Sequence, residues 1–172
     1  MAQARNGGFT LIEALMTVAL LAVLVTLAAP GLNELVRNNR MAAQTNDIMS
    51  LFAFARAEAM RRGARITVCP SGNGGSCSGG SDWSVGLIVF VDADRDGMVG
   101  VGEEVLRAMP ALSGGNTLSP SGGALAFIQF RGSGVAAAPG GVKLCDTRPD
   151  KGRSIVIAPT GSIRKTVNES CP

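Results

Sequence analysis

The carboxylate of Glu13 lies at the start of a segment with no other charge, which runs from Ala14 to Leu32. A lone carboxylate inside hydrocarbon costs about 3 kcal/mol, so such a group needs a cation close by. Cleavage of the chain between Gly8 and Phe9 would create an α-amino group four residues before Glu13. The spacing therefore indicates an acid–amine contact that becomes available after proteolysis.

A second group of carboxylates has the spacing of a calcium loop, D-x-D-x-D-G-x-[apolar]-x-x-x-E. Asp92, Asp94 and Asp96 would each supply one oxygen. The Met98 carbonyl and both oxygens of Glu103 would complete the ligand set. The segment before the loop is predicted as a strand, whereas an EF-hand loop follows a helix, so a solvated acidic hairpin turn is the alternative. Calcium is the only cofactor that the sequence offers.

The composition limits the chemistry that the chain can perform. Its 172 residues include neither histidine nor tyrosine, and the net charge is only +3. A histidine base and a histidine-based zinc site are therefore excluded. The length allows one membrane segment and one modest domain. No nucleophile–base pair can be assembled from the remaining motifs, so the sequence predicts a structural protein rather than an enzyme.

Four cysteines, all of which follow the apolar segment, indicate disulfides in an exported domain. Zinc is the rival partner of these cysteines, but the chain contains no C-x-x-C pair. The sequence favours the most local of the three possible pairings, Cys69–Cys77 with Cys145–Cys171, and leaves the other two open.

One long helix is predicted from Phe9 to about Arg62. Its first half, residues 9–32, is apolar on all sides, whereas its second half, residues 33–62, is amphipathic. The second half carries one apolar stripe with helical spacing, which should pack against a domain. The stripe consists of Met41, Ile48, Leu51, Phe52, Ala55 and Ala59.

Two residues should weaken this helix between its halves. Pro30 has no amide hydrogen to donate, so it should kink or locally loosen the helix, and the neighbouring Gly31 adds to that weakness. Gly63 is the predicted stop of the helix.

Beyond Gly63 the hydrophobic period shifts towards two, which is typical of β-strands. Breakers rich in glycine and proline, such as residues 110–123, separate short apolar runs, so antiparallel sheets are expected. The helical stripe can cover the apolar faces of these sheets. The sequence therefore predicts an α+β fold, a long N-terminal helix packed on antiparallel β-sheets. The predicted strands are 65–69, 84–91, 104–109, 124–130, 142–145, 153–158 and 163–167.

Residues 7–13, Gly-Gly-Phe-Thr-Leu-Ile-Glu, resemble the processing site of type IV pilins and type II secretion pseudopilins. An ordinary secretory signal, the alternative, would carry more positive charge before the apolar core and a small-residue cleavage site after it. The rest of the chain resembles minor pilins and pseudopilins of the GspH/FimT (FimU-like) type. This second resemblance rests on the loop between Cys69 and Cys77, Trp83 with Gly86-Leu-Ile-Val-Phe, the pair Glu103 and Glu104, Cys145-Asp-Thr-Arg-Pro, Gly152-Arg-Ser-Ile-Val-Ile and the final cysteine.

The resemblance implies the type IV pilin fold and a leader peptide that prepilin peptidase removes by cutting after Gly8. The same enzyme would methylate Phe9, and Glu13 would pair with the N-terminal amine of a neighbouring subunit. The implied regions are the leader (1–8), the transmembrane and assembly helix (9–32), the amphipathic helix packed on the head (33–62) and a β-rich periplasmic head (63–172).

The resemblance further implies a structural subunit, a minor pilin that primes or tips a type IV pilus used in twitching motility or adhesion. A pseudopilin of a type II secretion machine is the alternative with the same architecture. Other pilins, prepilin peptidase and the inner membrane would be the partners. The subunit would cross the inner membrane once and then enter a filament or its tip at the cell surface.

Some pilins of the FimT type are DNA receptors and carry Gly-Arg-x-Arg near the C-terminus, so DNA is a further candidate partner. This chain has Gly161-Ser-Ile-Arg164, which lacks the first arginine, although Lys165 follows. Together with Arg153 these cations would form a small patch, but no aromatic residues are interleaved to stack on bases. An ordinary charged surface strand is the alternative.

Overall fold

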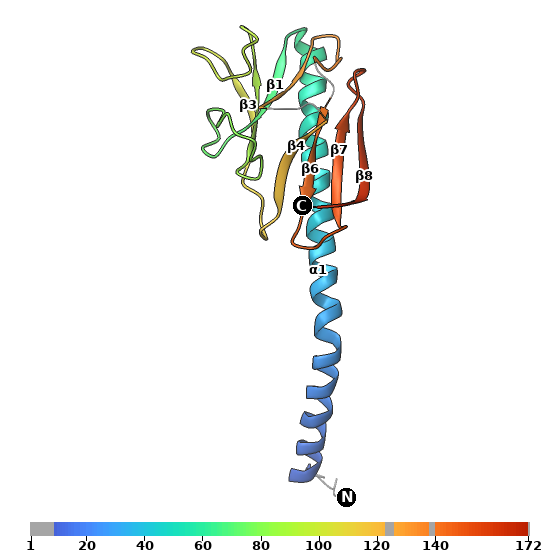
Figure 1. Ribbon diagram of the computed structural model, residues 1–172. Coiled ribbons are helices and arrows are strands. Elements are labelled where there is room, and N and C mark those ends of the chain that lie inside the picture. Colours follow the sequence, from blue (N-terminus) through green and yellow to red (C-terminus); the bar gives the residue numbers. More distant parts are fainter. Residues whose placement is uncertain (1–8, 123–125, 138–139, 172) are drawn as a thin grey trace, which may run out of the picture. The chain divides into compact units, whose positions relative to one another are not determined.

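The computed structural model of the protein describes residues 9–122, 126–137 and 140–171, with only the backbone described at residues 28–30. In this part of the chain one helix precedes eight strands (Figure 1). The helix α1 runs from Leu11 to Arg62. The strands are β1 (Ile66–Pro70), β2 (Leu87–Val91), β3 (Val105–Met109), β4 (Thr117–Ser121), β5 (Ile128–Phe130), β6 (Gly140–Cys145), β7 (Gly152–Ile157) and β8 (Ile163–Glu169).

The chain divides into two compact units, Met1–Arg40 and Met41–Pro172, and α1 contributes to both. The helix begins slightly later than predicted because the Thr10 hydroxyl caps it, accepting a hydrogen bond from the backbone N–H of Glu13 at 3.3 Å. Its end at Arg62 agrees with the prediction. Gly63 has a φ of 62°, the left-handed conformation that commonly follows a helix and that glycine adopts without strain.

The predicted apolar stripe of α1 forms the centre of the core in the second unit. Each of its six residues is at most 1% exposed, which confirms the prediction. Figure 1 shows strands of both sheets beside this part of the helix. The buried cluster around the stripe contains Ile66, Val68, Leu87, Val89 and Phe130 from one sheet, and Leu118, Val142, Leu144, Ile155 and Ile157 from the other.

The strands form two four-stranded sheets, with the orders β3-β2-β1-β5 and β4-β6-β7-β8. Every pair of neighbouring strands in the described residues is antiparallel, as predicted. Antiparallel sheets can bury one face and leave the other to solvent. Here both sheets turn apolar residues towards the same helical stripe, so the α+β fold with a long helix packed on antiparallel sheets is confirmed.

The predicted strands differ from the structure in several details, and the predicted strand 124–130 is too long, because β5 begins only at Ile128. Residues 110–123 are predicted as a breaker, yet they contain β4, in which Pro120 lies opposite Val142. Because β4 is an edge strand, a proline does not deprive a central ladder of a donor. The predicted strand 84–91 is too long: Gly86 has a φ of 117°, and a Cβ there would lie 2.7 Å from the carbonyl oxygen of Ser71.

Two disulfides, Cys69–Cys77 and Cys145–Cys171, account for all four cysteines. This is the most local of the three pairings that the sequence allows. The first bridge closes the loop after β1, and the second joins the segment after β8 to the end of β6. Each bridge restricts the unfolded chain, which typically contributes about 2–4 kcal/mol to stability.

Glu58 makes two ion pairs near the C-terminal end of α1. Its Oε2 lies 2.7 Å from Nη2 of Arg61 and 2.9 Å from Nε of Arg62. Hydrogen bonds from Arg61, and then from Arg62, lower the pKa of the Glu58 carboxyl from 4.5 to about 2. Both arginines also lie where a helix dipole favours positive charge.

This lowered pKa predicts a pH-dependent contribution to stability. Because the folded-state pKa is below the unfolded one, the contribution of Glu58 is complete above about pH 4.5 and is lost as the pH falls towards 2. We expect the difference in unfolding free energy between the wild type and Glu58→Gln to shrink over this window in urea titrations. Added salt should reduce the difference. A difference that stays constant down to pH 2 would contradict the assigned ion pairs.

Candidate functional site

The first candidate site is the N-terminal half of α1, which exposes much apolar surface. Phe9 is 84% exposed and Leu11 is 81% exposed, whereas the core stripe is at most 1% exposed. Contiguous apolar surface of this kind marks an interface with other proteins or with lipid. The exposed large hydrophobic residues here are Phe9, Leu11, Ile12, Leu15, Met16, Val18, Leu20, Leu21, Val23, Leu24, Val25, Leu27, Leu32, Leu35 and Val36.

The length and composition of α1 bear on whether it could span a membrane. Judged by length and composition, no single helix of the described residues qualifies, whereas Leu11–Leu27 and Gly31–Arg62 qualify together as a bent pair. The helical backbone continues through residues 28–30, whose side chains lie outside the described residues, so the kink expected at Pro30 stays a prediction. A Cβ built on Gly31 would contact nothing within 4 Å, so local packing does not require a glycine there.

Glu13 lies in the first turn of α1, where the positive end of the helix dipole favours a carboxylate. Its N–H donates to the Thr10 hydroxyl. Within residues 9–122, 126–137 and 140–171, no cation makes an ion pair with the Glu13 carboxylate. The cleavage position after Gly8 lies outside the described residues. The acid of the predicted acid–amine contact is therefore present at the helix start, and the contact itself stays a prediction.

The second candidate site is the loop between β2 and β3, which brings Asp92, Asp94 and Asp96 together. Carboxylate oxygens of these three residues lie within 4.8 Å of one another. Asp92 is buried, whereas Asp94 and Asp96 are exposed. The Asp96 N–H donates to Asp94 at 3.3 Å, and the Met98 N–H donates to Asp96 at 2.7 Å. These local bonds hold the loop in a compact turn.

Glu103 occupies a different place from the one predicted for a bidentate calcium ligand. Its Oε1 accepts a hydrogen bond from the Ala93 N–H at 2.7 Å, and its Oε2 accepts one from the Gly100 N–H at 2.8 Å. It is not a member of the group of three carboxylates. Both oxygens are engaged by backbone donors because the loop folds back on the side chain, so Glu103 closes the loop instead of pointing at a common centre.

Three donors hold one oxygen of Asp92. Its Oδ2 accepts hydrogen bonds from the Thr67 hydroxyl at 2.6 Å, from the Gln129 amide at 2.6 Å and from the Gly97 N–H at 3.2 Å. Thr67 on β1 lies directly opposite Gln129 on β5. Arg65 in turn donates to Gln129. The sequence pattern does not reveal this network, because Thr67 and Gln129 are 62 residues apart and meet only through strand register.

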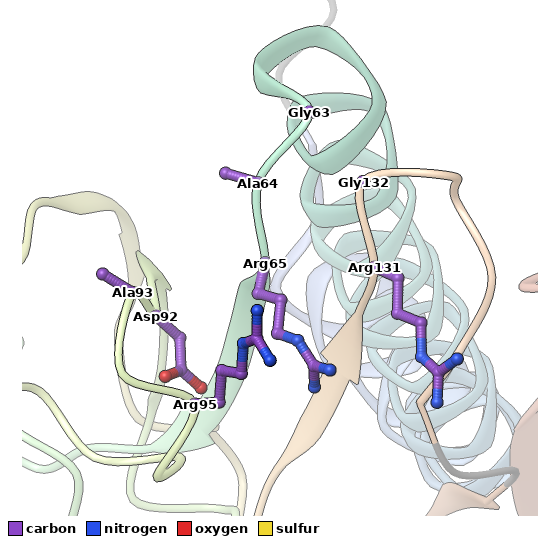
Figure 2. A pocket seen from close by; sticks show the side chains of 8 residues that line it. All are labelled: Gly63, Ala64, Arg65, Asp92, Ala93, Arg95, Arg131 and Gly132. Atoms are coloured by element: carbon purple, nitrogen blue, oxygen red, sulfur yellow. The ribbon is translucent and has the colours of Figure 1, made fainter.

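A pocket of about 340 Å³ adjoins Asp92 beside the C-terminal end of α1 (Figure 2). The side chains of Arg65, Arg95 and Arg131 line it, together with Asp92 and small residues. None of these arginines makes an ion pair with Asp92 in the part of the chain that the structure describes. The lining of the pocket thus carries three guanidinium groups and one carboxylate.

The cations predicted to contact DNA do not gather on one face of their sheet. In the β7–β8 pair Lys165 lies opposite Ile155, and Arg164 lies opposite Val156. Paired residues share a face and neighbours along a strand alternate, so Lys165 and Arg153 are on the face of Ile155, and Arg164 is on the other face. The sheet therefore separates these cations, and a DNA-receptor function is not favoured.

Comparison with known families matches two parts of the chain to two models. Residues 44–161 match the family described as type II transport protein GspH. Residues 3–29 match the prokaryotic N-terminal methylation motif, which includes Gly8, Phe9 and Glu13. Among curated proteins no significant sequence match is found.

Solved structures share the fold at low sequence identity. The type IV minor pilin FimU of Pseudomonas aeruginosa, in its P21 crystal form, superposes with a TM-score of 0.63 at 19% identity, covering 80% of this chain and 99% of the chain in that structure. Its P65 crystal form gives a TM-score of 0.57 at 18% identity, with 76% and 99% covered. The minor pseudopilin EpsH of the Vibrio cholerae type 2 secretion system gives a TM-score of 0.53 at 14% identity, with 74% and 97% covered.

Proposed function

Because the chain belongs to the family of type II transport protein GspH, we propose that it is a minor pilin, a structural subunit that primes or tips a type IV pilus. Family membership confirms the resemblance inferred from the sequence. The observation that carries the proposal is the exposed apolar half of α1, which overlaps an N-terminal methylation motif. Such a helix is suited to contact other helices of the same kind, so the role is mechanical and assigns no catalytic residue.

In this proposal the chain is processed before it assembles. Prepilin peptidase removes residues 1–8 and methylates Phe9. Residues 9–32 cross the inner membrane once, and residues 63–172 lie in the periplasm until the subunit enters a filament. The two disulfides support an oxidising location such as the periplasm, since disulfides rarely persist in the cytosol.

Within the filament, Glu13 selects the axial register of the subunit. Exposed residues such as Leu11, Ile12 and Leu15 pack on the helices of neighbouring pilins. In the correct register the Glu13 carboxylate meets the N-terminal amine of a neighbouring subunit. A shifted register leaves the carboxylate buried without a partner, which is strongly unfavourable.

Mass spectrometry of the mature protein, isolated from the membranes of its native host, tests the processing step. The expected protein begins with N-methylated Phe9 and lacks residues 1–8. A mature protein that still begins with Met1 would exclude processing by prepilin peptidase, and with it the proposed assembly.

A pseudopilin of a type II secretion machine is the second candidate, favoured by the family description and by the fold shared with EpsH. A strain that lacks the gene separates the two candidates. For a minor pilin we expect loss of surface pili and twitching with normal secretion of exported enzymes. Loss of secretion with normal twitching would assign the chain to the secretion machine instead.

A further inference from the structure

Asp92 has one buried oxygen that the protein does not satisfy. The residue is 1% exposed, and its Oδ1 has no hydrogen-bond partner among the described residues. Its Oδ2, in contrast, accepts from Thr67, Gln129 and Gly97. Those three bonds fix the orientation of the carboxylate, so Oδ1 cannot simply turn towards another donor. A buried carboxylate oxygen without a partner points to a positive group that binds there.

The geometry of the neighbouring carboxylates points to the nature of that group, and we propose that Asp92, Asp94 and Asp96 bind one Ca²⁺ ion. Two oxygens that bind the same Ca²⁺ at about 2.3–2.6 Å lie at most about 5.2 Å apart. The three carboxylates meet this condition, because each supplies one oxygen that lies within 4.8 Å of the oxygens supplied by the other two. Carboxylate oxygens are the ligands that this hard cation prefers. The exposed Asp94 and Asp96 give the ion a route from solvent to the buried Asp92.

No side-chain cation of the described residues already fills this role. Arg65, Arg95 and Arg131 line the pocket that adjoins Asp92 (Figure 2). None of them makes an ion pair with an aspartate of the loop in residues 9–122, 126–137 and 140–171. Arg65 donates to Gln129 instead. The three carboxylates thus stand close together without a positive partner from the described protein.

Glu103 is a positioning residue for this site. It closes the loop through the N–H groups of Ala93 and Gly100. A Cβ built on Gly100 would lie 3.6 Å from Asp94 Oδ2 and 3.6 Å from Glu103 Oε2, so these two carboxylates flank the same glycine. Glu103 therefore holds the loop closed beside the exposed Asp94 and Asp96 through its two hydrogen bonds from backbone N–H groups.

Binding of the ion should stabilise the second unit. Asp92 connects the loop to Thr67 on β1 and to Gln129 on β5, so an ion bound to Asp92 couples the loop to two strands of the sheet. A ligand at 100 times its Kd that binds only the folded state should raise the Tm of a domain of this size by about 5–10 °C.

The test uses the full chain in detergent micelles, stripped of divalent ions with EDTA and then titrated with CaCl₂. We expect isothermal titration calorimetry to show one Ca²⁺ per chain and thermal unfolding to show the increase in Tm. The double variant Asp94→Ala/Asp96→Ala removes two exposed carboxylates and leaves no side-chain oxygen in their place, so it should lose the calcium-dependent shift. Asp47→Ala, the same change at an exposed acid on α1, should keep it.

Three outcomes would overturn the proposal. They are a wild-type Tm that does not respond to calcium, a response that the double variant retains, and a response to MgCl₂ as large as that to CaCl₂. The last outcome would exclude the calcium assignment because Mg²⁺ requires shorter bonds and a stricter octahedral geometry. None of these results depends on which filament the subunit joins, so the calcium site and the proposed function are tested separately.

Discussion

Replacing Glu13 by alanine is expected to leave cleavage after Gly8 largely intact and to reduce incorporation of the subunit into filaments by about 100-fold. In the proposed assembly the alanine leaves the amine of the neighbouring subunit without its acid. An unpaired charge in hydrocarbon costs about 3 kcal/mol, which corresponds to about two powers of ten in an equilibrium constant. Immunoblots of sheared filaments and of membranes measure the incorporated and the processed protein separately.

The cap at the start of α1 supplies a control for this experiment. The Thr10 hydroxyl accepts the N–H of Glu13, so Glu13 stands at the third position of a capping box, where glutamine serves as well as glutamate. Glu13→Gln therefore keeps the helix start but removes the charge, and it should fail to incorporate as Glu13→Ala does. If Glu13→Gln incorporates normally while Glu13→Ala does not, then capping of the helix, and not the acid–amine contact, makes Glu13 necessary.

A second control tests whether any acid on the helix has the same effect. Glu34 is exposed on α1 but follows the apolar segment. Glu34→Ala should incorporate at the wild-type level, because Glu34 follows the uncharged segment from Ala14 to Leu32 and does not lie at its start. Equal defects in Glu13→Ala and Glu34→Ala would indicate a general effect of charge on the helix and would contradict a specific contact at Glu13.

The features that the sequence predicts well are those that depend on short spacings. The stripe of α1 follows a helical period over fewer than three heptads, and every member is buried. Gly63 ends the helix because its φ of 62° lies in the left-handed region, which glycine adopts without strain. The three aspartates of the loop come together because their spacing is short: five consecutive residues contain all of them. Local chemistry decides each of these features.

The features that the sequence does not reveal depend on register between distant strands. The contact of Asp92 with Thr67 and Gln129 exists only because β1 pairs with β5 in one particular alignment. The separation of Arg164 from Lys165 likewise follows from the alternation of faces in β8. The sequence does not predict β4, because proline and glycine in residues 110–123 are typical of a breaker. The strand forms nevertheless, because an edge strand tolerates Pro120.

Replacing Phe52 by alanine is expected to destabilise the second unit by about 3–5 kcal/mol, the usual cost of removing a fully buried phenylalanine. Phe52 is 0% exposed and belongs to the cluster that joins α1 to both sheets. Domains of this kind are typically stable by about 5–15 kcal/mol, so the loss is a large share of the total. Urea unfolding of the full chain in detergent micelles measures it through the fluorescence of Trp83, the only tryptophan, which is buried.

Phe54 is the matched control, since it lies two residues further along the same helix and undergoes the same change. It is only half-buried, and the guanidinium of Arg107 lies 5.5 Å from its ring centroid. Phe54→Ala should therefore cost about 1–2 kcal/mol, from lost cation–π and partial packing contacts. The difference between the two variants measures what burial in the stripe contributes. Equal losses would show that the two sheets are held by the helix as a whole and not by the face that carries Phe52.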